Sequence, residues 1–91
     1  MPDNDAMQQI DEHRVCIDEI DKKIVSLLNE RACESLAIRA LKPGAKLGLY
    51  DPRREEEIFE HVSSFNEGPL FNDDLRTIYA VILKVSKEMR S

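Results

Sequence analysis

The sequence predicts an all-α protein with one long and two shorter helices per chain, assembled as an antiparallel homodimer. Only three Gly, four Pro, three Phe and two Tyr occur in 91 residues, which argues against a β fold. The 28 residues that follow Arg14, up to Lys42, contain neither Pro nor Gly and predict one helical stretch of about 42 Å. Because a compact chain of this size is only about 30–35 Å across, a second copy is needed to cover that helix.

The first helix is expected at about residues 10–42, and Pro43-Gly44 should end it. Residues 1–9 are polar and acidic, and we interpret them as a flexible tail. Residues 10–91 are then expected to form the single domain.

The two shorter helices have recognisable beginnings. Asp51 is expected to be the N-cap of the second helix, with Pro52 at its first position, and an apolar face extends to about residue 65. Asn72 is expected to cap the third helix, which should run to the C-terminus.

Three cations lie on the apolar stripe of the long helix. Arg14, Arg31 and Lys42 fall on heptad positions a and d. They share that stripe with four apolar residues: Ile17, Ile24, Leu28 and Ile38. An unpaired buried cation costs several kcal/mol, so the stripe should close around an anion. Since Arg14 and Arg31 are roughly 25 Å apart along a helix, an antiparallel partner would bring its own Arg14 toward Arg31, giving two shared sites.

Further polar residues are expected to face the same site. Arg54 and Glu55 precede Ile58 by four and three residues, and Ser86 follows Ile82 by four, so each lies on an apolar helix face. The whole set is Arg14, Arg31, Lys42, Asp51, Arg54, Glu55 and Ser86. It is rich in cations and holds neither a nucleophile paired with a base nor a metal-ligand pattern. These residues predict a site that binds a small polyanion and acts by electrostatics and positioning.

Composition excludes several classes of partner. A net charge of −5 without a clustered basic face disfavours nucleic acid and anionic membranes. No apolar run approaches the ~18 residues of a membrane span. Cys16 and Cys33 are too far apart on one helix for a disulfide, which fits a reducing, cytoplasmic location. We interpret both cysteines, with His13 and His61, as structural, because none has a partner at a functional spacing.

Several motifs closely resemble the AroQ-class chorismate mutases. They are R-x-x-I-D-x-I-D-x-x-I-x-x-L-L-x-x-R from Arg14, then A-I-R-A-L-K, Y-D-P-x-R-E-E-E-I, G-P-L and I-Y-A-V-I-x-x-x-S. The resemblance covers residues 10–90. It implies an intertwined all-helical homodimer that converts chorismate, a small dicarboxylate, to prephenate in aromatic amino-acid biosynthesis, without cofactor or metal.

The resemblance also implies a role for each site residue. Arg14 would reach into the partner's site and hold one substrate carboxylate, Arg31 would hold another, and Lys42 would donate to the ether oxygen and a carboxylate. Asp51 and Glu55 match positions that bind the substrate hydroxyl. Arg54 matches a supporting position, and Ser86 matches a carboxylate contact.

One position departs from the family pattern. Four residues after the serine the family usually carries Gln or Glu, which donates to the ether oxygen opposite the lysine; this chain has Arg90. We expect Arg90 to take over that donation, the alternative being that the last turn frays and leaves it in solvent.

Other readings of these residues stay open. Taken singly, Arg31 has Glu34 or Glu55, and Arg54 has Asp51 or Glu57, as partners for ordinary ion pairs. An isochorismate pyruvate lyase shares the fold and much of the site, although the full Asp-Pro-x-Arg-Glu run and Ser86 favour the mutase. A non-catalytic dimerisation or regulatory domain of a larger shikimate-pathway enzyme is the third reading.

Overall fold

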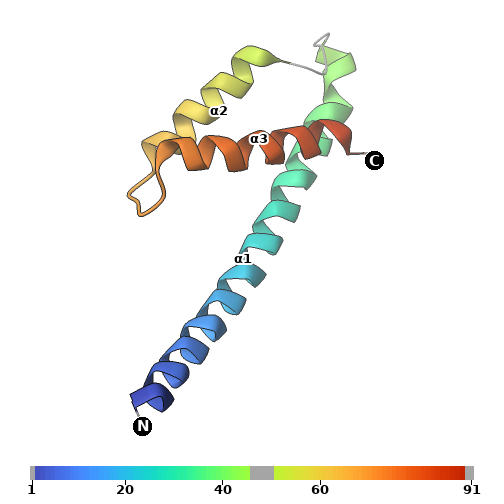
Figure 1. Cartoon of the computed structure of the whole chain (residues 1–91). Coiled ribbons are helices and arrows are strands. Elements are labelled where there is room, and N and C mark those ends of the chain that lie inside the picture. Colours follow the sequence, from blue (N-terminus) through green and yellow to red (C-terminus); the bar gives the residue numbers. More distant parts are fainter. Residues whose placement is uncertain (1, 46–50, 90–91) are drawn as a thin grey trace. The chain divides into compact units, whose positions relative to one another are not determined.

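A computed structural model of the chain contains three α-helices and describes residues 2–45 and 51–89. The helices are α1 (Pro2–Ala45), α2 (Pro52–Ser64) and α3 (Asn72–Glu88) (Figure 1). Within those two ranges there is no β-strand, so the predicted all-α class is confirmed. The chain divides into two compact units, Met1–Glu34 and Ser35–Ser91, which are described separately below.

Helix α1 begins earlier and ends later than expected. It begins at Pro2 rather than near residue 10, so residues 2–9, expected to be a tail, are helical. Proline is tolerated in a first helical turn, and no helix breaker follows it until Pro43. The helix continues past Pro43 to Ala45. Because only two helical residues follow this proline, the helix still ends within one turn of it.

In the unit Met1–Glu34, the described residues 2–34 form a single stretch of helix. Every residue from 4 to 30 is exposed in the single chain. The large apolar side chains among them are Met7, Ile10, Val15, Ile17, Ile20, Ile24, Val25, Leu27 and Leu28. An apolar surface of this extent marks a protein interaction site.

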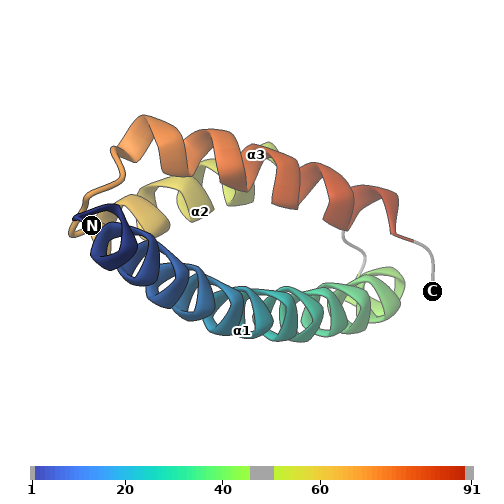
Figure 2. The ribbon, with the colours of Figure 1, turned by 60° about the horizontal axis from the view of Figure 1, so that its bottom comes forward.

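The unit Ser35–Ser91 contains the end of α1 and an antiparallel hairpin of α2 and α3, which lie side by side (Figure 2). The apolar faces of the two helices meet there, and Leu83 is the most enclosed of the described core residues at 7% exposure. Arg76 of α3 joins the two helices of the hairpin at its exposed, outer surface. Its guanidinium lies 3.0 Å from the Glu56 carboxylate of α2 and 4.3 Å from the centre of the Phe59 ring.

Helix α2 begins as its sequence predicts. The Asp51 backbone is extended, and its Oδ1 accepts a hydrogen bond of 3.2 Å from the Arg54 amide. Pro52 occupies the first turn, where its missing N–H leaves no helical bond unmade. The helix ends at Ser64, beside the predicted end near residue 65.

The predicted cap of α3 was wrong. The helix already includes Asn72, and Phe71 precedes it as the N-cap residue, with its amide donating to Asp74 Oδ2 over 2.9 Å. The Asn72 side chain instead accepts a 2.8 Å hydrogen bond from Asn66, which also donates to the Leu70 carbonyl over 2.7 Å. The Asn72 side-chain oxygen, which was expected to cap α3, therefore accepts a hydrogen bond that closes the α2–α3 turn.

The same turn uses a glycine at a backbone angle that other residues avoid. Gly68 has φ +79°, and its amide donates to Asn66 Oδ1 over 3.0 Å. At the other end of α3, the helix stops at Glu88 and Met89 is extended, whereas the sequence predicted a helix to the C-terminus. Arg90 and Ser91 lie outside the described residues.

Candidate active site

Two of the predicted site residues belong to the unit Met1–Glu34. Arg14 is exposed, with Nη1 at 3.8 Å from Asp11 Oδ1 and with side-chain exposures of 70% and 67% for the two partners. Such a long contact between exposed groups restrains the guanidinium little. Arg31 is half-buried and lies 17 residues further along the same helix, about 25 Å along its axis. One chain therefore does not bring Arg14 and Arg31 together.

The remaining described site residues belong to the unit Ser35–Ser91. Lys42 is half-buried in the last turn of α1, and Glu55 is half-buried in the first turn of α2. Ser86 is half-buried in the last turn of α3, and Asp51 and Arg54 are exposed at the start of α2. Each of these residues thus lies within about a turn of a helix end.

An ion pair joins α2 to α3 at this place. Lys87 Nζ lies 3.0 Å from Glu55 Oε2, and the Glu55 side chain is only 24% exposed, against 45% for Lys87. The Glu55 carboxylate is therefore held on the inner side of the hairpin, facing α3. Lys87 was not among the predicted site residues, although a basic residue beside Ser86 in the last turn of a helix was a signal for it.

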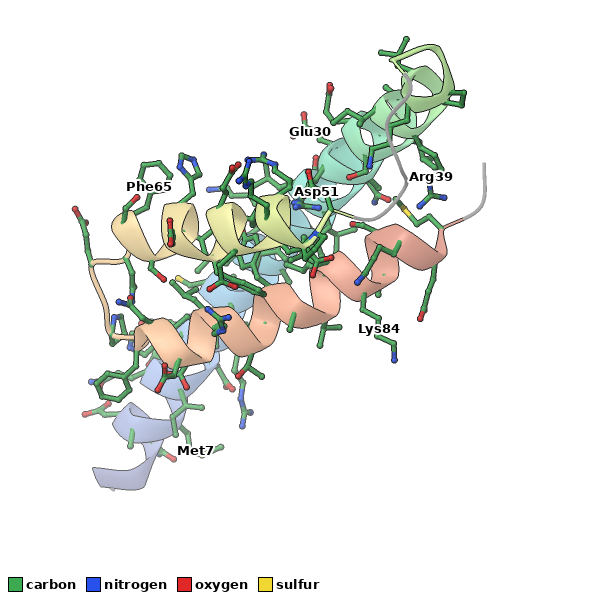
Figure 3. The ribbon with its side chains drawn as sticks, turned by 90° about the horizontal axis from the view of Figure 1, so that it is seen from above. Met7, Glu30, Arg39, Asp51, Phe65 and Lys84 are labelled. Atoms are coloured by element: carbon green, nitrogen blue, oxygen red, sulfur yellow. The ribbon has the colours of Figure 1, made fainter. Side chains whose placement is uncertain are left out.

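A second set of contacts joins α1 to the C-terminal turn of α3. The Arg39 guanidinium donates to the carbonyls of Ser86 over 2.7 Å, of Lys87 over 3.1 Å, and of Met89. Figure 3 shows Arg39 at this end of α3. Arg39 belongs to the motif A-I-R-A-L-K but was not a predicted site residue, because it lies off the heptad stripe.

Asp51 and Arg54, at the start of α2, contact residues that are close to them in the sequence. The Asp51 carboxylate caps the helix, as described above, and Figure 3 places it at the beginning of α2. Arg54 Nη1 lies 3.5 Å from Glu57 Oε2, and both side chains are more than half exposed. The ion pair of Arg54 with Glu57 is thus formed in the single chain, as the simpler reading of these residues expected.

Other kinds of site find no support in the described parts of the chain. Residues 2–45 and 51–89 contain no group of three or more His, Cys, Asp or Glu side chains suited to a metal ion. Cys16 and Cys33 are both exposed free thiols. Among the described helices, none is long and apolar enough to cross a membrane.

The charges of the second unit define a class of site. Arg39 joins α1 to α3, and the Glu55–Lys87 ion pair joins α2 to α3. The helix ends joined in this way carry Lys42, Glu55 and Ser86. A cation, a carboxylate and a hydroxyl in such an arrangement bind a small polar anion by charge and hydrogen bonds rather than by covalent chemistry. The fold is all-helical, and the charges at these helix ends suit a small anion.

The chain belongs to the chorismate mutase type II family, whose model matches residues 13–91. It is 35% identical to a bifunctional chorismate mutase/prephenate dehydratase of Aquifex aeolicus over 92% of this chain and 25% of that protein. It is 38% identical to the bifunctional enzyme of the same description from Neisseria gonorrhoeae over 84% of this chain and 22% of that protein. The chain thus spans about a quarter of the length of these curated relatives.

Two solved structures match most of this chain. Form II of the chorismate mutase from Thermus thermophilus has a TM-score of 0.85 and 31% identity, covering 89% of this chain and 92% of that one. Form I of the same enzyme has a TM-score of 0.82 and 32% identity, covering 86% and 98%. The predicted resemblance to the all-helical chorismate mutases is therefore confirmed.

Proposed function

We propose that this chain is a chorismate mutase, an isomerase that rearranges chorismate to prephenate for aromatic amino-acid biosynthesis. One observation carries the proposal beyond family membership. The described contacts join the ends of α1, α2 and α3 where Lys42, Glu55 and Ser86 lie, residues on three separate segments that were expected to meet one ligand. The proposal includes no cofactor or metal, because a pericyclic isomerisation adds and removes no atoms or electrons and the charged side chains supply the electrostatic stabilisation.

The chemistry explains why these residue types suit the reaction. A pericyclic rearrangement transfers no proton, so catalysis comes from holding the flexible dicarboxylate in its compact diaxial conformer and stabilising negative charge on the ether oxygen. Arginines bind carboxylates through two parallel hydrogen bonds, whereas an ammonium acts as a point charge. In this proposal Arg14 and Arg31 hold the carboxylates, and Lys42 donates to the ether oxygen.

The other residues complete the binding of the substrate. Asp51 and Glu55 accept from its hydroxyl, Ser86 donates to a carboxylate, Arg54 supports the site from beside it, and Arg90 donates opposite Lys42. If the preorganised contacts gave a rate enhancement of roughly a millionfold, they would lower the activation free energy by about 8 kcal/mol. Two or three such charged contacts can supply that much.

We further propose that the active unit is an intertwined antiparallel homodimer with two shared sites. The exposed apolar side chains of α1 between residues 7 and 28 need a cover, and a second copy of the chain supplies an apolar surface of the same kind. The exposed Arg14, whose contact with Asp11 is loose, is then available to the partner's site. A cytoplasmic location fits the two free thiols.

The direct test follows the loss of chorismate absorbance when the protein is added, with the product identified by chromatography. Prephenate is the expected product. Salicylate formed from isochorismate, without turnover of chorismate, would instead indicate the lyase that shares this fold. No turnover of either substrate would contradict both enzymes and leave a dimerisation or regulatory domain.

A further inference from the structure

We infer that Arg39 is a positioning residue for the proposed mutase reaction, which it serves by fixing the last turn of α3 from α1. This inference rests on the proposed function. It adds to the site a residue that touches no substrate and acts through Ser86 and Lys87. The evidence is the geometry of the guanidinium and of the turn that it holds.

The last turn of α3 is a place where backbone groups need outside partners. Helix α3 ends at Glu88, and the carbonyls in the last turn of any helix lack the N–H groups that would follow in a longer helix. Arg39 Nη2 donates to Ser86 O over 2.7 Å and to Lys87 O over 3.1 Å, while Nη1 donates to Met89 O. A cation at a helix C-terminus is also favoured by the helix dipole. One planar side chain therefore binds three carbonyls at the end of the helix, those of Ser86, Lys87 and Met89.

The held turn leads directly to two groups of the proposed site. Arg39 binds the backbone carbonyl of Ser86, the same residue whose side chain belongs to the proposed site. The adjacent Lys87 reaches across to Glu55 over 3.0 Å. A shift of this turn would therefore displace the Ser86 hydroxyl and loosen the Glu55 carboxylate together. Displacements of about 1 Å in a preorganised site commonly lower a rate by up to a hundredfold.

Arg76 offers a matched control for the effect on stability alone. Like Arg39, it is an arginine that joins two helices of the same unit, through Glu56 and the Phe59 ring. Those contacts lie on the outer side of the hairpin and include none of the proposed site residues. Arg76→Ala should therefore lower the melting temperature without lowering kcat/KM, when activity is measured well below that temperature.

The test combines hydrogen exchange with a double-mutant cycle. Turnover of chorismate by the parent is established first, so that a failure of the proposed function is recognised before any variant is compared. Arg39→Ala should then lower kcat/KM at least tenfold and raise amide exchange in the last turn of α3. Arg39→Lys, which keeps the charge but loses the two-pronged donor, should fall between the parent and Arg39→Ala. Arg39→Lys also keeps the inference testable if Arg39→Ala does not fold.

The cycle with Ser86→Ala decides whether Arg39 acts through this turn. Because the two residues act on one group, Arg39→Ala combined with Ser86→Ala should lose little more than the worse single variant, whereas Arg76→Ala and Ser86→Ala should be independent. In an active parent, additive losses for the Arg39 pair would overturn the inference. So would a kcat/KM for Arg39→Ala and Arg39→Lys equal to that of Arg76→Ala, and both results would leave the mutase assignment intact.

Discussion

Lys87 and Glu55 connect the last turn of α3 to the first turn of α2 through a 3.0 Å contact. The carboxylate in this pair is the one expected to accept from the substrate hydroxyl. Its direction is therefore set by α3 as well as by its own helix. The orientation of a residue that the sequence assigns to the site thus depends on a neighbour that sequence patterns do not single out.

The first prediction concerns that pair. Lys87→Ala should raise KM about three- to tenfold, because the Glu55 carboxylate loses the cation that orients it. The free energy of unfolding should change by at most about 1 kcal/mol, since both groups are partly exposed. Lys84→Ala is the matched control, because Lys84 lies on the same helix and points away from α2 (Figure 3). Equal kinetic constants for the two variants would show that Lys87 does not orient Glu55.

The second prediction concerns the cations. Arg31→Ala or Lys42→Ala should lower kcat/KM about a hundredfold or more while the far-ultraviolet circular dichroism of the helices persists, as expected for the loss of a preorganised donor. Lys42→Arg should restore only part of the activity, because a guanidinium fork cannot take the position of an ammonium at the ether oxygen. Near-normal turnover in either alanine variant would refute the role given to that residue.

Local and distant contacts differ in how well the sequence predicts them. The cap of α2 was predicted correctly because Asp51 and Arg54 are three residues apart and need no tertiary contact. The cap of α3 was not, because Asn66, six residues earlier, binds the Asn72 oxygen. Tertiary competition for one oxygen atom cannot be read from a capping pattern.

The residues of the candidate site also fall into those that the sequence pointed to and those that it did not. The heptad pattern and the family resemblance selected Lys42, Glu55 and Ser86, which the described contacts place on joined helix ends. Arg39 and Lys87 escaped notice because their partners lie 47 to 50 and 32 residues away in the sequence. Hydrophobic periodicity identifies which residues share one face of a helix, but not which end of another helix that face contacts.

The third prediction concerns Arg90, the departure from the family pattern, whose role is still a proposal. Arg90→Ala should lower kcat/KM strongly, and Arg90→Gln should recover much of it, because an amide can donate to the ether oxygen as the guanidinium is proposed to do. Steady-state kinetics of both variants beside the parent make the comparison. If both variants were as active as the parent, Arg90 would lie outside the site.

The fourth prediction concerns assembly. Light scattering at micromolar concentration should give twice the chain mass of 10.5 kDa, because α1 exposes too much apolar surface for a stable single chain. Ile24→Glu, which places a charge on that surface, should shift the protein toward monomers and lower activity with it. Full activity in a well-folded monomer would contradict the shared site.

The most direct test of the account mixes two inactive variants, Arg14→Ala and Lys42→Ala, by refolding them together. If Arg14 serves the partner's site, each mixed dimer has one complete site, and random pairing should restore about a quarter of the parental chorismate mutase activity. Mixing Arg31→Ala with Lys42→Ala is the control and should restore none, because the proposal assigns both residues to one chain's site. A mixture of Arg14→Ala and Lys42→Ala no more active than the two variants measured separately would contradict a site built from two chains.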